Sequence, residues 1–249
     1  MYYYGARYYD PRISIFVSVD PLAEETMTPY QYVSNNPIML IDPNGKNAVV
    51  TIKGNTMTVK STIYIHGHGA TKDKAKSIEK GIKSFWGSNH TYVDKANNKR
   101  YNVVFDVDVQ VKPTDYNGVK EVGKSFDEGH FNIVELMEGD FRSIVLGNGF
   151  VGQWGESDSD NTYAHEFGHL LGIADMYYPS EKEVGKYENY QGVDENDIMG
   201  KNMHKKDARV SQENIDGIAE KVLRDKDSNN QARIGGSYGR SRDNKNLCK

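Results

Sequence analysis

Alternating apolar and polar residues predict that most of the chain after residue 45 folds into strands and helices. The longest alternation runs from Asn102 to Val111, with apolar residues at every odd position and mostly polar residues at the even positions. This period of two predicts a strand with one buried face, which Pro113 ends. Asp106 and Asp108 belong to the polar face, and an exposed strand face accounts for this carboxylate pair without a catalytic role.

Shorter strands are expected on both sides of this one. Residues 49–53 and 57–65 flank a Gly-Asn pair, which favours a tight turn, so the two segments predict a hairpin. Two further strands are expected later in the chain, at residues 131–137 and 143–146.

Two amphipathic helices are predicted from apolar residues spaced three and four apart. The first lies between Thr71, a residue type that favours the N-cap position, and Gly87, and the second begins after Ser211. Their apolar faces consist of Ala75, Ile78, Ile82 and Phe85 in the first, and of Ile215, Ile218, Ala219, Val222 and Leu223 in the second. Strands and helices together indicate an α+β domain over residues 46–225.

Both ends of the chain lack this periodicity. Residues 1–45 are rich in Tyr, Pro, Asn and Asp and contain three Asp-Pro pairs. Residues 226–249 contain almost nothing apolar to bury, so we expect a disordered tail there.

The composition makes some classes of function less favoured. The formal net charge is -4 at pH 7, so no excess of basic residues favours a nucleic acid partner. The apolar runs are far shorter than the roughly 20 residues of a membrane span. The residues after Met1 lack the basic-then-apolar order of a signal peptide, and the single Cys248 permits no internal disulfide.

The residues with the clearest chemistry lie in the segment YAHEFGHLLGIAD. Ser159 and Asp160 favour a helix start just before it. His165 and His169 are four residues apart, so on a helix their rings point to a common site with the separation that two zinc ligands need. Glu166 is rotated by about 100° from His165 and stands beside the metal, where it can serve as the general base.

Gly172 and Asp175 complete the predicted metal site. A glycine can take a positive φ, end the helix and return the chain towards the metal. Asp175 would then be the third ligand, and three protein ligands leave the fourth zinc position open to water, as in catalytic sites. The alternative for Asp175 is a surface carboxylate at the end of a helix.

A methionine turn follows at residues 196–200, which read NDIMG, with Met199 at its tip. A methionine at a turn usually indicates only core packing. Together with the preceding segment, however, it completes the pattern HExxHxxGxxD plus Met-turn, which resembles the metzincins. The resemblance implies a zinc metalloendopeptidase with a zincin fold: a twisted mixed sheet, an active-site helix, a C-terminal helix, a cleft at an edge strand and a methionine beneath the zinc.

One departure from that family concerns the group that stabilises the oxyanion. Some metzincins have a tyrosine two residues after the methionine, but Lys201 stands there in this chain, and His204 is another candidate nearby. The tyrosine-rich residues 176–190 are expected to cover the cleft or the surface rather than to react.

Other histidines allow a structural interpretation. His66 and His68 could form a second metal site, but one loop histidine and one packing histidine explain the pair as well. His130, beside Asp127 and Glu128, fits a solvated loop group.

The N-terminal segment resembles the closing part of the RHS repeat-associated core. The motifs are YYYGARYYDP at residues 2–11, DPLAEE at 20–25 and PYQYVSNNPIMLIDPNG at 29–45. In that family the repeats build a large β-shell, and the chain that follows is a variable effector, often a toxin. The resemblance therefore implies a secreted toxin that a specialised route delivers into a target cell, with the RHS shell and a cognate immunity protein as partners.

Lys46 stands where such families have the apolar residue of a self-cleavage site, so residues 42–45 are interpreted as a tight turn.

Two other functions stay open at this point. The domain could be a non-catalytic zincin-fold module for adhesion or for closing the shell, although Glu166 argues against it. A toxin with nuclease activity is the other alternative, and the net charge gives it little support.

Overall fold

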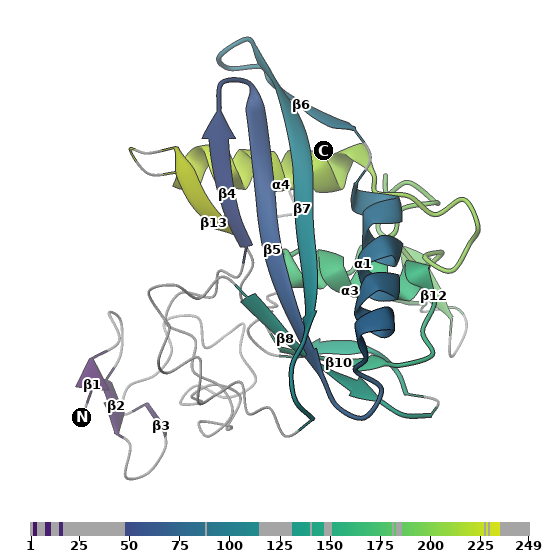
Figure 1. Ribbon diagram of the computed structural model, residues 1–249. Helices are drawn as coiled ribbons and strands as arrows, with labels where there is room; N and C mark the ends of the chain where they lie inside the picture. Colours follow the sequence, from purple (N-terminus) through teal and green to yellow (C-terminus); the bar gives the residue numbers. More distant parts are fainter. Residues whose placement is uncertain are drawn as a thin grey trace.

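The computed structural model describes residues 48–87, 89–114, 131–139, 141–146, 151–180, 182, 186–226, 228 and 230–234, together with residues 2–3, 8–10 and 15–16. This part of the chain is a mixed α+β structure (Figure 1). Its helices are α1 (Lys72–Trp86), α3 (Asp160–Leu170) and α4 (Gln212–Asp225). None of the helices in these ranges has the length and apolar character that crossing a membrane requires.

Eight strands form the main sheet. They are β4 (Ala48–Lys53), β5 (Thr56–His66), β6 (His90–Asp94), β7 (Lys99–Val111), β8 (Phe131–Met137), β9 (Ile144–Leu146), β10 (Val151–Gly155) and β13 (Gln231–Ile234). β5 is central: β7 runs parallel to one of its edges, while the other edge pairs first with antiparallel β4 and then with parallel β8. β6 lies antiparallel to β7, β13 antiparallel to β4, and β10 parallel to β8, with antiparallel β9 at the edge. The expected mixed sheet is confirmed.

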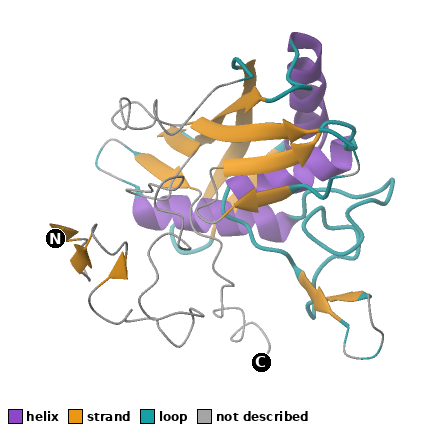
Figure 2. Cartoon of the chain, turned by 90° about the horizontal axis from the view of Figure 1, so that it is seen from below, coloured by secondary structure: helices purple, strands orange, loops and turns teal. Residues whose placement is uncertain are grey.

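Two small antiparallel sheets lie outside the main one. Near the N-terminus, β2 (Tyr8–Asp10) pairs with both β1 (Tyr2–Tyr3) and β3 (Ile15–Phe16). β11 (Tyr177–Pro179) and β12 (Tyr187–Asn189) form a hairpin that projects from the domain (Figure 2).

The structure confirms the elements that the periodicity predicts most clearly. The β4–β5 hairpin turns at Gly54, which has a φ of +60°. In β7 the odd positions from Tyr101 to Val109 are buried, while Val104 on the opposite face is 46% exposed. Thr71 caps α1 by accepting a hydrogen bond from the backbone N–H of Lys74 at 3.1 Å, and Ser211 caps α4 in the same way.

The prediction of a disordered tail from residue 226 was wrong for residues 231–234. These residues form β13, which pairs with β4, and both Ala232 and Ile234 are buried. A strand of four residues inside a polar segment is too short to show a period of two, and β4 stabilises it by long-range pairing. Residues 235–249 lie outside the described part of the chain.

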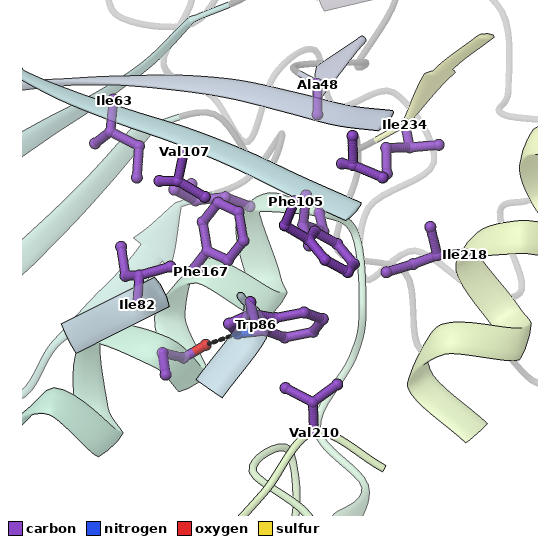
Figure 3. Close-up of a cluster of buried hydrophobic side chains, with 14 of the residues drawn as sticks. Ala48, Ile63, Ile82, Trp86, Phe105, Val107, Phe167, Val210, Ile218 and Ile234 are labelled. Carbon is purple, nitrogen blue, oxygen red and sulfur yellow. Dashed lines mark hydrogen bonds between the residues drawn. The ribbon is translucent and has the colours of Figure 1, made fainter. Parts of the chain in front are cut away.

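The core lies between one face of the sheet and the helices, and Trp86 is at its centre (Figure 3). The Trp86 ring meets Phe105 of β7 and Phe167 of α3 edge-on, with ring centroids 5.1 and 5.7 Å apart. Its Nε1–H donates to the carbonyl of Ala164 at 2.9 Å. Aromatic pairs of this kind contribute about 0.5–1.5 kcal/mol beyond their buried area. These contacts fix α3 against both α1 and the sheet.

Candidate metal centre

Helix α3 carries the first part of the site and is buried along most of its length. Ser159 accepts a hydrogen bond from the backbone N–H of Thr162 at 3.3 Å and so caps the helix, as expected. The Tyr163 hydroxyl donates to the carbonyl of Gly155 at 2.8 Å, which ties the first turn to the end of β10. All residues from Tyr163 to Leu170 are buried, so the histidines between them have little freedom to move.

The helix ends at Leu170, and Gly172 just beyond it has the positive φ that the sequence predicts, at +84°. The Ile173 N–H donates to the carbonyl of Gly168 at 3.0 Å, and the Gly172 N–H donates to that of His169 at 2.9 Å. These two bonds form a Schellman motif, which requires a left-handed residue at this position. The chain therefore turns back and brings Asp175 towards the helix.

Three side chains converge after this turn. The Nε2 atoms of His165 and His169 are 3.0 Å apart, and Oδ1 of Asp175 lies 3.3 and 3.4 Å from them. Two ligands of a tetrahedral zinc ion at ordinary bond lengths are about 3.3 Å apart. Within the described part of the chain, these three residues are the one group of His, Cys, Asp and Glu side chains close enough to hold a metal ion.

The hydrogen bonds behind the histidines determine which nitrogen faces the site. Nδ1 of His165 lies 2.8 Å from the carbonyl of Ile198, and Nδ1 of His169 lies 2.8 Å from that of Ile173. A carbonyl oxygen only accepts, so each Nδ1 donates its proton to a carbonyl, and Nε2 of each ring is the nitrogen that faces the site. Two imidazole nitrogens and one carboxylate oxygen thus point at one place, and this set of ligand atoms fits a cation.

The two carboxylates of the site differ in their environment. Burial by itself would raise the pKa of Asp175, but the hydrogen bonds and charges of His165 and His169 outweigh it and hold the pKa below its ordinary value. Burial raises the pKa of Glu166 to about 7, against the opposing effect of His165. Oε2 of Glu166 is buried and has no hydrogen-bond partner among the described residues. Glu166 therefore has free proton-accepting capacity.

The predicted methionine turn is connected to both the ligands and the core. Met199 is fully buried, and the backbone carbonyl of Ile198 before it is the one that holds His165. The Met199 carbonyl accepts a hydrogen bond from the N–H of Met176, the residue after Asp175, at 2.9 Å. The turn thus supports two of the three converging side chains through its backbone.

Asp197 stabilises this turn from inside the protein. Its side chain is fully buried, and Oδ1 accepts hydrogen bonds from the Met199 N–H at 2.8 Å and from Nδ2 of Asn214 at 2.7 Å. The second bond links the turn to the first turn of α4. The sequence shows no sign of this role, because an Asp in a turn is ordinary on the surface.

The metal-site cavity has a volume of about 730 Å³ and contains all three converging ligands and Glu166. Ile144 and Val145 of the edge strand β9 form part of its wall. Lys201 and His204, the two positions considered for oxyanion stabilisation, line it as well. Arg142 also lines the cavity and was missed in the sequence, since no local pattern connects it to the histidines.

The tyrosine-rich hairpin borders the same cavity, as expected. Tyr177 and Tyr187 line it, and their rings meet edge-on with centroids 5.3 Å apart. Burial raises the pKa of Tyr177, and so do its charge interaction and hydrogen bond with Asp175. Tyr177 is thus a partner of Asp175, and no local pattern in the sequence connects the two.

The other histidine candidates do not gather into a second site. His66 ends β5, and burial lowers its pKa while Glu135 opposes the shift. His68 is 82% exposed and forms an ion pair with Glu138. In the ranges that the structure covers, no third ligand joins this pair.

Two other sequence predictions fall outside the described residues. They are the loop interpretation of Asp127, Glu128 and His130 and the tight turn at residues 42–45.

Comparison with known proteins does not assign a family. No protein-family model matches the chain. A stretch of 52 residues, 21% of this chain, is 44% identical to Salivary gland surface protein 1 of Aedes aegypti. The matched stretch is 2% of the length of that protein, so the similarity concerns a small part of either chain.

Proposed function

We propose that this chain is a zinc-dependent endopeptidase, in which His165, His169 and Asp175 hold the metal and Glu166 is the general base. The observation that carries the proposal is the convergence of three acceptor atoms within 3.0 to 3.4 Å of one another, inside an open cavity. Three protein ligands with space beside them are typical of catalytic rather than structural zinc sites. The zincin fold and the metzincin family belong to this proposal too.

Each ligand has a defined task in the proposed reaction. The carbonyls of Ile198 and Ile173 orient the histidine rings so that Nε2 of each would face the metal. Zinc, when bound, would lower the pKa of a water molecule and polarise the carbonyl of the scissile peptide bond. Asp175 adds a negative charge to the site and would neutralise part of the charge of a bound metal.

Glu166 would move the proton. It follows His165 directly on α3, its side chain is buried, and its Oε2 has no hydrogen-bond partner within the described chain. Oε2 can therefore accept the proton of the attacking water and pass it to the leaving amine. The carbonyl oxygen of the substrate would need a donor on the opposite side, and Lys201, His204, Arg142 and Tyr177 line that cavity.

Zinc content and proteolysis test the proposed peptidase function. Purified wild-type protein and Glu166→Gln should both contain about one zinc ion per chain, because Glu166 is not a ligand. Wild type should cleave casein, while Glu166→Gln should be slower by about 10²- to 10⁴-fold, the usual contribution of general acid–base catalysis. Equal rates, or no cleavage by either protein, would remove the enzyme proposal.

We also propose that the peptidase is a secreted effector linked to an RHS core, with a cognate immunity protein. Support comes from the motifs at residues 2–11, 20–25 and 29–45, which resemble the RHS core. Expression of the full chain in the bacterial cytoplasm should slow growth, and Glu166→Gln should not. Coexpression of the protein encoded next to it should restore growth. Toxicity that is the same in both variants would contradict the effector proposal.

A further inference from the structure

A second cavity, of about 480 Å³, lies beside the metal-site cavity. The residues that line both are Arg142, Asp175, Tyr177 and Tyr187. The two cavities therefore meet at the third metal ligand and at the β11–β12 hairpin. A group held in the second cavity would lie next to the reacting centre.

Helix α4 forms one wall of this second cavity, and a glycine stands in the middle of that wall. Glu213, Gly217 and Lys221 all line the cavity and are spaced four apart, so they form one row along the helix. A Cβ on Gly217 would meet no atom within 4 Å. Glycine inside a helix costs about 0.5–1 kcal/mol relative to alanine. Close packing does not require this glycine, and its effect is to leave the cavity open.

The deeper lining of the second cavity is apolar. Leu171 and Ile173 contribute from the turn after α3, Ile218 from α4 and Ile234 from β13. Of these, Leu171, Ile218 and Ile234 are buried parts of the core, so the lining is rigid. Glu213 and Lys221 carry opposite charges at the two ends of the helix row, so the wall has no excess of one charge. A cavity of this kind favours an apolar occupant over a charged one.

We propose that the second cavity binds a large apolar side chain of the peptide substrate, such as phenylalanine or leucine, and that Gly217 determines this specificity. The inference rests on the peptidase function proposed above, and it names the substrate class of that same site. The volume is within the range of about 300–1,000 Å³ that is usual for ligand pockets. The edge-on pair of Tyr177 and Tyr187 lines both cavities, at the place where they meet.

Filling the cavity from α4 tests the proposal. Zinc-loaded wild type, Gly217→Ala and Gly217→Trp are compared on synthetic peptides in which one position at a time near the scissile bond is phenylalanine or alanine. At one position, wild type should prefer phenylalanine by about 10-fold or more in kcat/KM, which is the discrimination that a hydrophobic pocket achieves. Gly217→Trp should abolish this preference, and Gly217→Ala should reduce it less.

The matched control is Glu220→Trp, which places the same side chain on an exposed position of α4 that does not line either cavity. It should keep the wild-type preference. Circular dichroism and zinc content verify that each variant folds. If Gly217→Trp misfolds, Gly217→Leu replaces it. If the Gly217 variants that fill the cavity cleave peptides with an unchanged phenylalanine preference, the proposed side-chain pocket is wrong and the proposed peptidase function stands. Failure of wild type to cleave any peptide would overturn the proposed function and the pocket together.

Discussion

The side chain of Met199 lies directly against the backbone of Gly168. This glycine stands between the two histidines in the sequence of α3. A Cβ at residue 168 would overlap with the sulfur of Met199 and would stand 3.3 Å from Cζ2 of Trp86. The methionine turn and the helix can approach this closely because the residue has no side chain. Gly168 is thus a packing requirement of the candidate metal centre, in addition to the Gly172 turn.

Gly168→Ala should destabilise the protein and weaken zinc binding. The added methyl group must push Met199 or Trp86 aside, and overpacking in a core costs about 1–3 kcal/mol. Urea unfolding gives the free energy change, and competition with a chelator gives the zinc affinity. Gly217→Ala is the control, since its methyl group enters open space and should stabilise α4 by about 0.5–1 kcal/mol. Similar losses in both variants would show that the contact with Met199 has no effect.

Asp197→Ala should unfold more easily than wild type, because it leaves two buried donors without an acceptor. The N–H of Met199 and Nδ2 of Asn214 both bond to Oδ1, and an unsatisfied buried group costs about 1–3 kcal/mol. Asp197→Asn keeps an oxygen at this place and should lose much less. Denaturant unfolding of the three proteins without zinc measures the difference. Equal stability of Asp197→Ala and Asp197→Asn would contradict the role assigned to this oxygen.

The convergence of His165, His169 and Asp175 could be predicted from sequence because its geometry is local. His165 and His169 lie on a single helix, and Asp175 follows after one glycine turn, so the spacing of residues alone places them. The supporting residues could not be predicted in this way. Arg142 comes before β9, and Asp197 depends on Asn214 of α4, so both require contacts between distant segments.

The fold shows the same division between local and long-range information. The long alternation of β7 and the spacing of apolar residues in α1 and α4 predict these elements almost to their ends. β10 was missed because its sequence VGQWG contains two glycines, which are rare inside strands. β13 was missed because only its pairing with β4 makes it a strand.

Zinc should raise the melting temperature of the wild-type protein, and a chelator should reverse the shift. A ligand that binds only the folded state at 100 times its Kd stabilises it by about 2.7 kcal/mol. His165→Ala removes one of the converging ligands and should lose this shift. His68→Ala, an exposed histidine outside the group, should retain it. A zinc-dependent shift that persists in His165→Ala would place the metal elsewhere.

His90 should make the protein less stable in weak acid. Burial lowers its pKa below the ordinary 6.5, against an opposing effect of the Trp86 and Phe85 carbonyls, and the ring meets Phe105 edge-on. The unfolded chain therefore binds a proton more readily than the folded chain. The stabilising contribution is present above pH 6.5 and is lost as the pH falls through the lowered pKa.

His90→Gln keeps a polar side chain at this place but cannot titrate. Urea unfolding of metal-free wild type and variant is compared from about pH 8 to about pH 5, where the single histidine accounts for the difference in slope. Wild type should lose more stability than His90→Gln over this range. If the stabilities of wild type and His90→Gln change in parallel with pH, the packing between α1 and β7 does not require the neutral form of His90.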